Sequence, residues 1–419
     1  TTNLDVVDID GAVDMASTLA VAGVVTVSDG SSSAPSITNV GDTNSGLYFP
    51  ADDNVGLVIG GSRKLLANSS GVTINNGDLT LPDGTDLITG SAGTSNFRAG
   101  VNAGNSITSG GNYNVVVGDE AGTALTIGDS NVVLGYQAGA SLTGGNSNVA
   151  IGYQALLTED SYGANIAIGD SALKLQDSGA TAYNIAIGHE AGSAITTGVQ
   201  NILIGGLAGD AITDQSNITA VGNTALTANT SGQRGTAVGA AALASNTTGN
   251  FNTAVGFTAL TNNTTGYNNA AFGYQSMATN TTGVNNNAFG NATLTTNTTG
   301  SSNVAMGHGA LNLNTTASNN TAVGYFALLA NTTGTNNVAV GKNALDANTT
   351  ANANIAVGAS SLGANTTGAS NIGIGHEALG ANTTGGENTA IGYAALDANT
   401  TASNNTAVGY LSLSANTTG

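Results

Sequence analysis

Residues 320–334 read Asn-Thr-Ala-Val-Gly-Tyr-Phe-Ala-Leu-Leu-Ala-Asn-Thr-Thr-Gly, and a close variant of this stretch begins again at Asn337. If the glycine that closes each Ala-Val-Gly is taken as a marker, eighteen copies run from Gly118 to Gly409. The step from one marker to the next is always seventeen, except from Gly169 to Gly188, where it is nineteen. A fixed period of this length is typical of a solenoid, in which successive coils stack on one another.

The copies fall into two sets. The first six, Gly118 to Gly205, vary and often have Ala-Gly where later copies have Ala-Leu. The last twelve, Gly222 to Gly409, are nearly interchangeable and add Asn-Thr seven residues after the marker glycine. Because a binding site needs a distinctive set of side chains, we expect the regular set to be chiefly a spacer.

Within each copy, the three residues before the marker alternate in size, as in Val338-Ala339-Val340. Because alternate side chains of a strand point to opposite faces, we expect a short strand whose first and third residues, including Val340, face the core. A leucine four residues after the marker, such as Leu260, supplies a second buried position, and Asn-Thr-Thr-Gly favours a turn. Each copy therefore predicts one coil with about two short strands and two turns. At roughly 4.8 Å per coil, the eighteen copies would extend about 85 Å.

Asparagine lies four residues before the marker in sixteen of the eighteen copies, with Ile218 and Gly235 as the exceptions. Such a row is either a ligand-binding surface or a ladder in which each amide bonds the next coil. Identical amides stacked at strand spacing favour the ladder.

One coil offers only three or four medium-sized apolar side chains, which is too few for a private core, so we expect a parallel homotrimer that shares one. The strings Asn148–Gly152, Asn165–Gly169 and Asn184–Gly188 read Asn-x-Ala-Ile-Gly. They resemble the head repeat of trimeric autotransporter adhesins, and this resemblance implies a left-handed parallel β-roll. The usual coil of that family is shorter than the repeat of this chain.

The array occupies residues 96–419, and residues 1–95 read as β-rich fibre modules, with strand alternation over 19–27. Residues 30–75 contain Ser-Ala-Pro-Ser-Ile, Gly-Asp-Thr-Asn-Ser-Gly-Leu-Tyr and Gly-Gly-Ser-Arg. These motifs resemble a small β module of bacteriophage tail fibres. The resemblance implies a virion protein whose partners are other tail or baseplate proteins and a glycan or protein on the host cell surface.

The composition narrows the range of partners. A net charge of −19, from 25 acidic and 6 basic residues, argues against nucleic acid and anionic membranes. No segment approaches the roughly 20 apolar residues of a membrane span, and the lack of cysteine excludes disulfides. We expect the array to continue beyond Gly419 and specific recognition to lie there.

An aromatic column follows the marker glycines. We consider its members as candidate glycan or receptor contacts, because rings with flanking Asn and Thr can stack on sugars. The same rings could instead cover a turn or pack between chains. The candidates are Tyr136, Tyr153, His189, Tyr274, His308, Tyr325, His376, Tyr393 and Tyr410.

We expect no enzyme, cofactor or metal. The histidines are too far apart to share an ion, and the side chains of His376 and Glu377 should diverge on a strand. The acidic residues lack the spacing of a calcium loop. The sequence therefore favours the shaft of a phage tail fibre that contributes to host attachment. A trimeric adhesin head on a bacterial surface is the alternative. An ice-binding solenoid ranks third, because the repeated threonines lie in a predicted turn.

Overall fold

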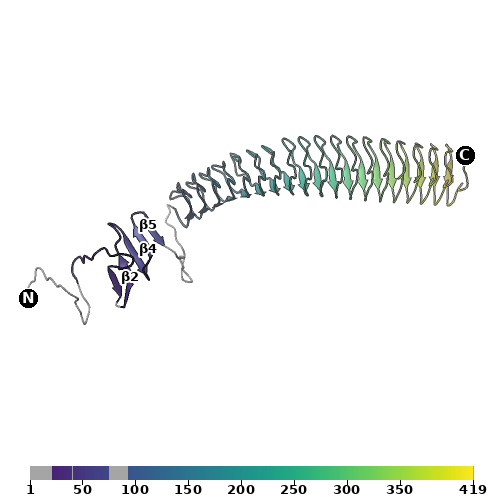
Figure 1. Ribbon diagram of the computed structural model, residues 1–419. Helices are drawn as coiled ribbons and strands as arrows, with labels where there is room; N and C mark the ends of the chain where they lie inside the picture. The colour runs from purple at the N-terminus through teal and green to yellow at the C-terminus, as the bar shows by residue number, and fades with distance from the viewer. Residues whose placement is uncertain (1–20, 40, 75–92, 419) are drawn as a thin grey trace, which may run out of the picture. The chain divides into compact units, whose positions relative to one another are not determined.

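The computed structural model describes residues 21–39, 41–74 and 93–418, and within these ranges the chain is all-β, with no helix. Contacts divide the chain into two units, residues 1–87 and 88–419 (Figure 1). Across the described ranges, nothing helical has the length and apolarity that crossing a bilayer requires.

The first unit holds an antiparallel sheet of five strands paired in chain order. Tyr48 lies buried across from Gly56, where an added Cβ would come within 2.3 Å of the tyrosine ring, so this position requires glycine. The sheet confirms a small N-terminal β region. The strand expected over 19–27 is not formed at 21–27, and residues 19 and 20 lie outside the described part. The strands are β1 (Ile37–Asn39), β2 (Asp42–Tyr48), β3 (Val55–Ile59), β4 (Ser62–Asn68) and β5 (Gly71–Ile74).

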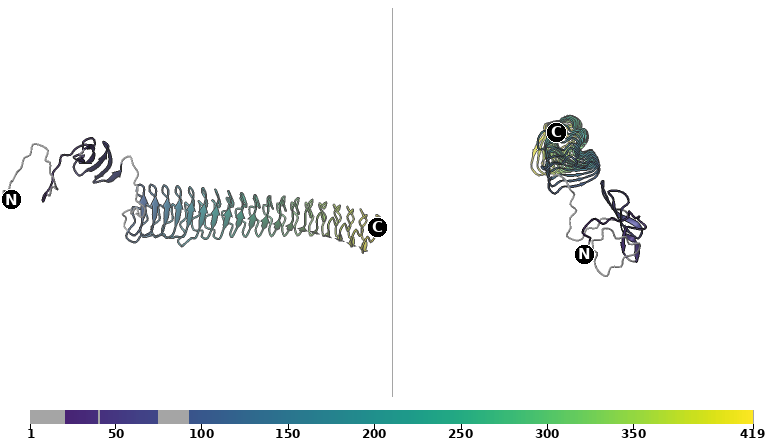
Figure 2. Two further views of the ribbon diagram at one scale, coloured as in Figure 1. Left: turned by 90° about the horizontal axis from the view of Figure 1, so that it is seen from below. Right: turned by 90° about the vertical axis from the view of Figure 1, so that its left-hand side faces the viewer.

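The second unit is a parallel β-solenoid, as predicted, with one three-residue strand per coil (Figure 1 and Figure 2). Among the described strands, β6 pairs only with β7 and β24 only with β23, so the sheet is open. The strands are β6 (Phe97–Ala99), β7 (Val115–Val117), β8 (Val132–Leu134), β9 (Val149–Ile151), β10 (Ile166–Ile168), β11 (Ile185–Ile187), β12 (Ile202–Ile204), β13 (Thr219–Val221), β14 (Thr236–Val238), β15 (Thr253–Val255), β16 (Ala270–Phe272), β17 (Asn287–Phe289), β18 (Val304–Met306), β19 (Thr321–Val323), β20 (Val338–Val340), β21 (Ile355–Val357), β22 (Ile372–Ile374), β23 (Thr389–Ile391) and β24 (Thr406–Val408).

The strand register follows the repeat. Val338 pairs with Ile355, one coil on, and Ile166 pairs with Ile185 across the longer repeat. The two extra residues are therefore absorbed outside the strand, and the sheet continues through them without a slip.

The expectation of two strands per coil is wrong. Leu260, in the predicted second strand, has a φ of 50°, a left-handed conformation that ends extended structure. Its amide still donates to the next coil, to the Ser276 carbonyl at 3.0 Å, and Thr264 donates likewise to Thr281 at 2.9 Å. Backbone hydrogen bonds thus join successive coils beyond the strand as well.

The assignment of the buried strand face is also wrong. Val340 is 36% exposed, whereas Ala339 between the two valines is fully buried. The core of a coil consists of this alanine, a second alanine and the leucine, as in Ala254, Ala259 and Leu260. The interior is narrow, because a Cβ added at Gly373, the equivalent of Ala339, would lie 2.6 Å from Ser361 Oγ. In the late coils this middle position therefore holds alanine or glycine, and the β-branched residues point outward. Early coils with glycine at 122 and 209 instead admit Val116 and Leu203 at the middle position. Each chain has a core of its own.

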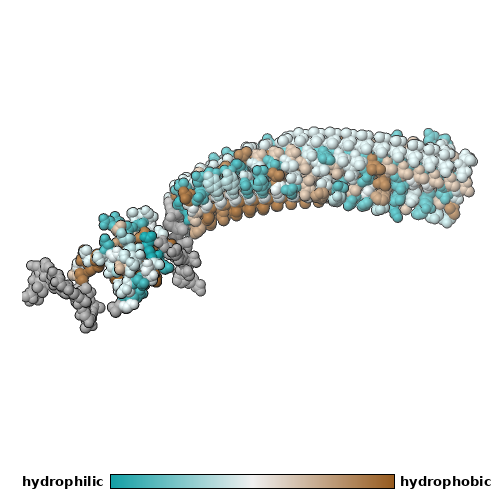
Figure 3. All heavy atoms as spheres, viewed as in Figure 1, coloured by the Kyte–Doolittle hydropathy of each residue, from teal (hydrophilic) through white to brown (hydrophobic). Residues whose placement is uncertain are grey.

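The outward face carries an unbroken apolar row, formed by the third residue of each strand from β7 to β24. Figure 3 shows brown along the edge of the early coils. All eighteen members are at least partly exposed. They are Val117, Leu134, Ile151, Ile168, Ile187, Ile204, Val221, Val238, Val255, Phe272, Phe289, Met306, Val323, Val340, Val357, Ile374, Ile391 and Val408.

The predicted asparagine ladder is confirmed. The backbone amide of Asn303 donates to Asn286 Oδ1 at 3.0 Å, and Asn303 Nδ2 donates to the Ala317 carbonyl at 2.9 Å. A second ladder, which the sequence interpretation assigned to turns, runs through the asparagines seven residues after the marker. Asn297 Nδ2 donates to Asn280 Oδ1 at 2.8 Å, and both residues are fully buried.

Candidate functional site

The structure groups eight of the nine candidate contact residues into ring stacks, and their side chains are largely exposed. His189 stands apart from them, between Asp170 and Gly206 in the same column. The stacked pairs and their centroid distances are Tyr136–Tyr153 at 5.7 Å, Phe257–Tyr274 at 5.8 Å, His308–Tyr325 at 5.4 Å, His376–Tyr393 at 5.4 Å and Tyr393–Tyr410 at 5.3 Å.

Stacking within the column limits what a ligand can reach. A ring face that lies against the next ring cannot also stack on a sugar, so within the stacks free faces occur only at the ends. His376 ends one stack beside Ala359, and Tyr274 ends another beside Asn291. The carboxylate of Glu120 raises the pKa of Tyr136, which keeps that phenol neutral. The column therefore offers a few separate platforms rather than a continuous one.

The expectation that His376 and Glu377 diverge is wrong. His376 Nδ1 lies 3.6 Å from Glu377 Oε2, and both side chains are about half exposed. Glu377 has a φ of 55°, so it belongs to a turn and the alternation of a strand does not apply. Among the described residues, no serine or threonine hydroxyl is hydrogen-bonded to a histidine.

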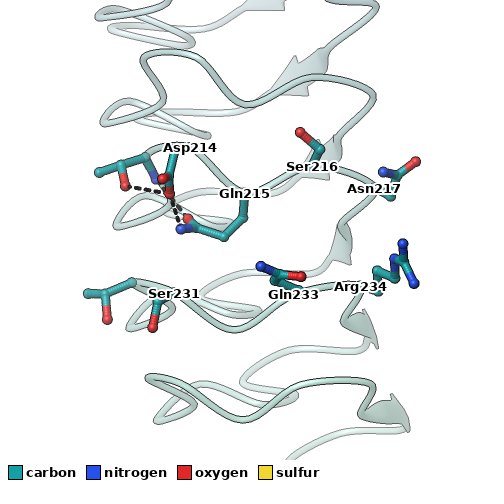
Figure 4. A pocket seen from close by; sticks show the side chains of 9 residues that line it. Asp214, Gln215, Ser216, Asn217, Ser231, Gln233 and Arg234 are labelled. Atoms are coloured by element: carbon teal, nitrogen blue, oxygen red, sulfur yellow. Dashed lines mark hydrogen bonds between the residues drawn. The ribbon is translucent and has the colours of Figure 1, made fainter.

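A polar hollow of about 560 Å³ lies where the first asparagine ladder is interrupted by Ile218 and Gly235 (Figure 4). In Figure 4, Asp214 and Gln215 lie on one coil, and Arg234 lies on the next. Gln215 is tied to its own coil, because Oε1 accepts from the Thr213 amide at 3.1 Å and Nε2 donates to the Asp214 carboxylate. The lining residues are Thr213, Asp214, Gln215, Ser216, Asn217, Thr230, Ser231, Gln233 and Arg234.

The side chains that line this hollow include hydrogen-bond donors, hydrogen-bond acceptors and charged groups, but they offer little apolar surface. The Arg234 guanidinium lies 5.8 Å from the centre of the Phe251 ring, which places an aromatic face beside the charged group. Such a set suits a small hydroxylated ligand. The sequence interpretation did not single it out, because its residues become neighbours only when one coil is stacked on the next.

A second hollow, the acceptor groove, measures about 480 Å³ and runs over four coils. Glycines at 363 and 380 leave it open, where neighbouring coils place Asp346 and Asp397. Asn343 Oδ1 and Asp397 Oδ1 are buried and unpartnered, and burial raises the pKa of Asp346. Unpaired acceptors call for donors, so this groove suits a ligand rich in hydroxyl groups.

Three carboxylates lie close together, two from the coil before the longer repeat and one from the longer repeat itself. Ligand atoms of Glu159, Asp160 and Asp177 all lie within 4.8 Å of one another. Glu159 is fully buried, and burial raises its pKa to about 7, aided by the two aspartates, while backbone amides of Tyr162 and Ser178 oppose the rise. Its Oε1 accepts from the Tyr162 amide at 3.2 Å, but its Oε2 has no hydrogen-bond partner.

The repeated threonines are held by the backbone. Thr264 Oγ1 donates to the Thr281 carbonyl at 3.1 Å, and Thr281 Oγ1 donates to the Thr298 carbonyl at 3.0 Å. These hydroxyls therefore form hydrogen bonds from one coil to the next.

Comparison with protein-family models, with curated proteins and with solved structures gives no match to this chain.

Proposed function

We propose that this chain is the shaft of a homotrimeric virion fibre, a phage tail fibre that contributes to host attachment. The observation that carries the proposal is the unbroken register of the parallel sheet together with the apolar row on its outward face. An array joined coil to coil by backbone and amide hydrogen bonds is stiff along its length, and stiffness is what a shaft requires.

The apolar row supports the trimer. Monomeric proteins rarely leave long apolar surfaces in water, and at about 4.8 Å per coil this row extends about 85 Å. Parallel chains in equal register would bring identical rows together about one axis and cover them. The case for a trimer thus rests on this exposed row, since each coil already has its own core.

The five-stranded N-terminal sheet supports the virion assignment, because β1 to β5 lie within the residues that resemble a tail-fibre module. Attachment would use weak contacts that are repeated along the shaft. The free ring face of His376 lies in the same coil as Glu377 of the acceptor groove, and together they suit a sugar. Repetition in three chains raises avidity without requiring a tight single site.

The test is the mass of the assembled chain in solution by sedimentation. We expect a particle of three times the 40.6 kDa chain mass, and a folded monomer would overturn the trimer. Labelling with an antibody against residues 93–418 then distinguishes the candidates. Label on virus particles supports the fibre. Label on bacterial cells supports the adhesin that the Asn-x-Ala-Ile-Gly strings favour.

A further inference from the structure

We propose that Glu159, Asp160 and Asp177 form a binding site for one calcium ion at the irregular coil of the array. This site is independent of the proposed function, because a cation here would stabilise the array whatever the array attaches to.

The geometry fits one ion. Calcium–oxygen distances of about 2.3–2.6 Å place two ligands on opposite sides of the ion about 5 Å apart. The three carboxylates offer atoms within 4.8 Å of one another, which is within that limit. Within the described part of the chain, none of the three forms an ion pair with a lysine or arginine. Three carboxyl groups thus lie together without a positive group to offset their charge.

The buried oxygen of Glu159 supports the site independently of the clustering of carboxylates. In later coils the position seven residues after the marker holds an asparagine, whose amide bonds the next coil. Here the adjacent coils place Leu142 and Gln176 at that position. Gln176 directs Oε1 to Asn184 Nδ2 at 2.6 Å and Nε2 to the Thr196 carbonyl at 3.3 Å, so it leaves Glu159 Oε2 unpartnered. A buried carboxylate oxygen without a donor calls for a cation.

The longer repeat, from Gly169 to Gly188, contributes the third ligand, Asp177. Thr158 Oγ1 donates to the carbonyls of Lys174 and Gln176, each at 3.1 Å, so the segment before Glu159 is fixed against the segment before Asp177. Asp177 and Asp160 are exposed, whereas Glu159 is buried, so the site is open on its outer side. Water can complete the shell there. Flexible carboxylates with an open side suit calcium better than magnesium, which demands a tight octahedron.

The experiment is titration calorimetry on the whole chain after treatment with a chelator. We expect one Ca²⁺ per chain, with weaker binding of Mg²⁺. Glu159→Gln and Asp177→Asn should each weaken calcium binding about tenfold or more. Glu159→Gln should fold, because the next coil already places glutamine at this position in Gln176. Asp170→Asn, an exposed acidic residue in the aromatic column, is the matched control and should leave affinity unchanged.

Hydrogen exchange provides a second readout. Calcium should slow exchange in residues 156–165 and 172–182 of the wild type but not of Glu159→Gln. The proposal is overturned if no saturable binding occurs up to about 10 mM Ca²⁺, above the range of weak extracellular sites. It is also overturned if Glu159→Gln binds like the wild type, or if Asp170→Asn weakens binding equally, since both results mean general attraction to an acidic surface.

Discussion

The early and late coils fill the same interior with different residues. In the coil of Gly135, glycine at 139 is paired with Leu142, and a Cβ added to that glycine would lie 2.8 Å from Leu142 Cδ1. In the coil of Gly290, the leucine moves to 294 and asparagine takes position 297. A leucine enters the core of each of these two coils, from either of two positions. The early coil adds Val133 where the late coil has Ala288, so the apolar share of the core differs between them.

This exchange explains why the late coils are interchangeable. An asparagine at the second position bonds the same residue one coil away, so each coil favours a neighbour of its own kind. The early coils lack this ladder and tolerate variation. The longer repeat and the carboxylates of Glu159, Asp160 and Asp177 occur among them.

The largest effect is expected from placing an early residue in a late coil. Asn297→Leu would crowd Leu294 and remove the amide that donates to Asn280 Oδ1. Overpacking and an orphaned buried acceptor each cost about 1–3 kcal/mol, so we expect a loss of about 3 kcal/mol. Hydrogen exchange of the neighbouring coils measures this loss. A change below about 1 kcal/mol would show that the late ladder is not a constraint.

The mirror variant places a late residue in an early coil. Leu125→Asn leaves a cavity beside Gly122 and an amide between Ile107 and Leu142, neither of which can bond it. We expect a comparable loss of about 3 kcal/mol, from the cavity and from the buried amide. Exchange protection of coils 118–150 measures it, and full protection would mean that the two core types are interchangeable.

A double variant tests whether the two positions compensate. Leu294→Gly combined with Asn297→Leu recreates the early core within a late coil. It should recover about 1–2 kcal/mol relative to Asn297→Leu alone, because crowding is relieved but the ladder remains broken. A double-mutant cycle on the same exchange data gives the coupling. Additive losses would mean that the leucine does not occupy the same space in the two core types.

The sequence predicted the features that depend on the period. The coil, the parallel stacking, the asparagine ladder and the common column of Tyr136 and its equivalents all follow from the constant spacing of the marker glycines. The assignment of the inward face failed at Val340. Alternation identifies two faces, but only the width of the coil interior, which is limited by residues such as Ser361, determines which one is buried.

The sites were less predictable than the fold. The acceptor groove depends on which coils lack a side chain at 363 and 380, and the carboxylate cluster depends on the path of the longer repeat. Glu159 and Asp177 are far apart in the sequence and do not follow the regular spacing of the repeat. A signal was present in the sequence, since Glu159 stands where later copies have asparagine.

The apolar row runs over both sets of coils, so substitutions in it test the outer surface of early and late coils alike. Val340→Asp in a late coil and Ile168→Asp in an early coil replace partly exposed members, so each should change the stability of its own coil by less than about 1 kcal/mol. If the rows pack between chains, both variants should shift the chain toward monomer. Sedimentation measures this, with Thr333→Asp, away from the row, as the control. A shift by only one variant would restrict the interface to one set of coils.

The smallest effect is expected from removing late coils, whose sequences are nearly interchangeable. Deleting residues 286–319 or residues 337–370 removes two whole late repeats and joins equivalent positions, so the register is preserved. Each should shorten the array by about 10 Å and leave the trimer intact. The two deletions differ in one respect, because only the second removes Asn343 and Asp346 from the acceptor groove. Attachment to host cells should be unchanged by the first deletion and at most slightly reduced by the second.

A large loss from both, with the trimer intact, would mean that the late coils are themselves the receptor-binding surface. A large loss from the second alone would place recognition in the groove.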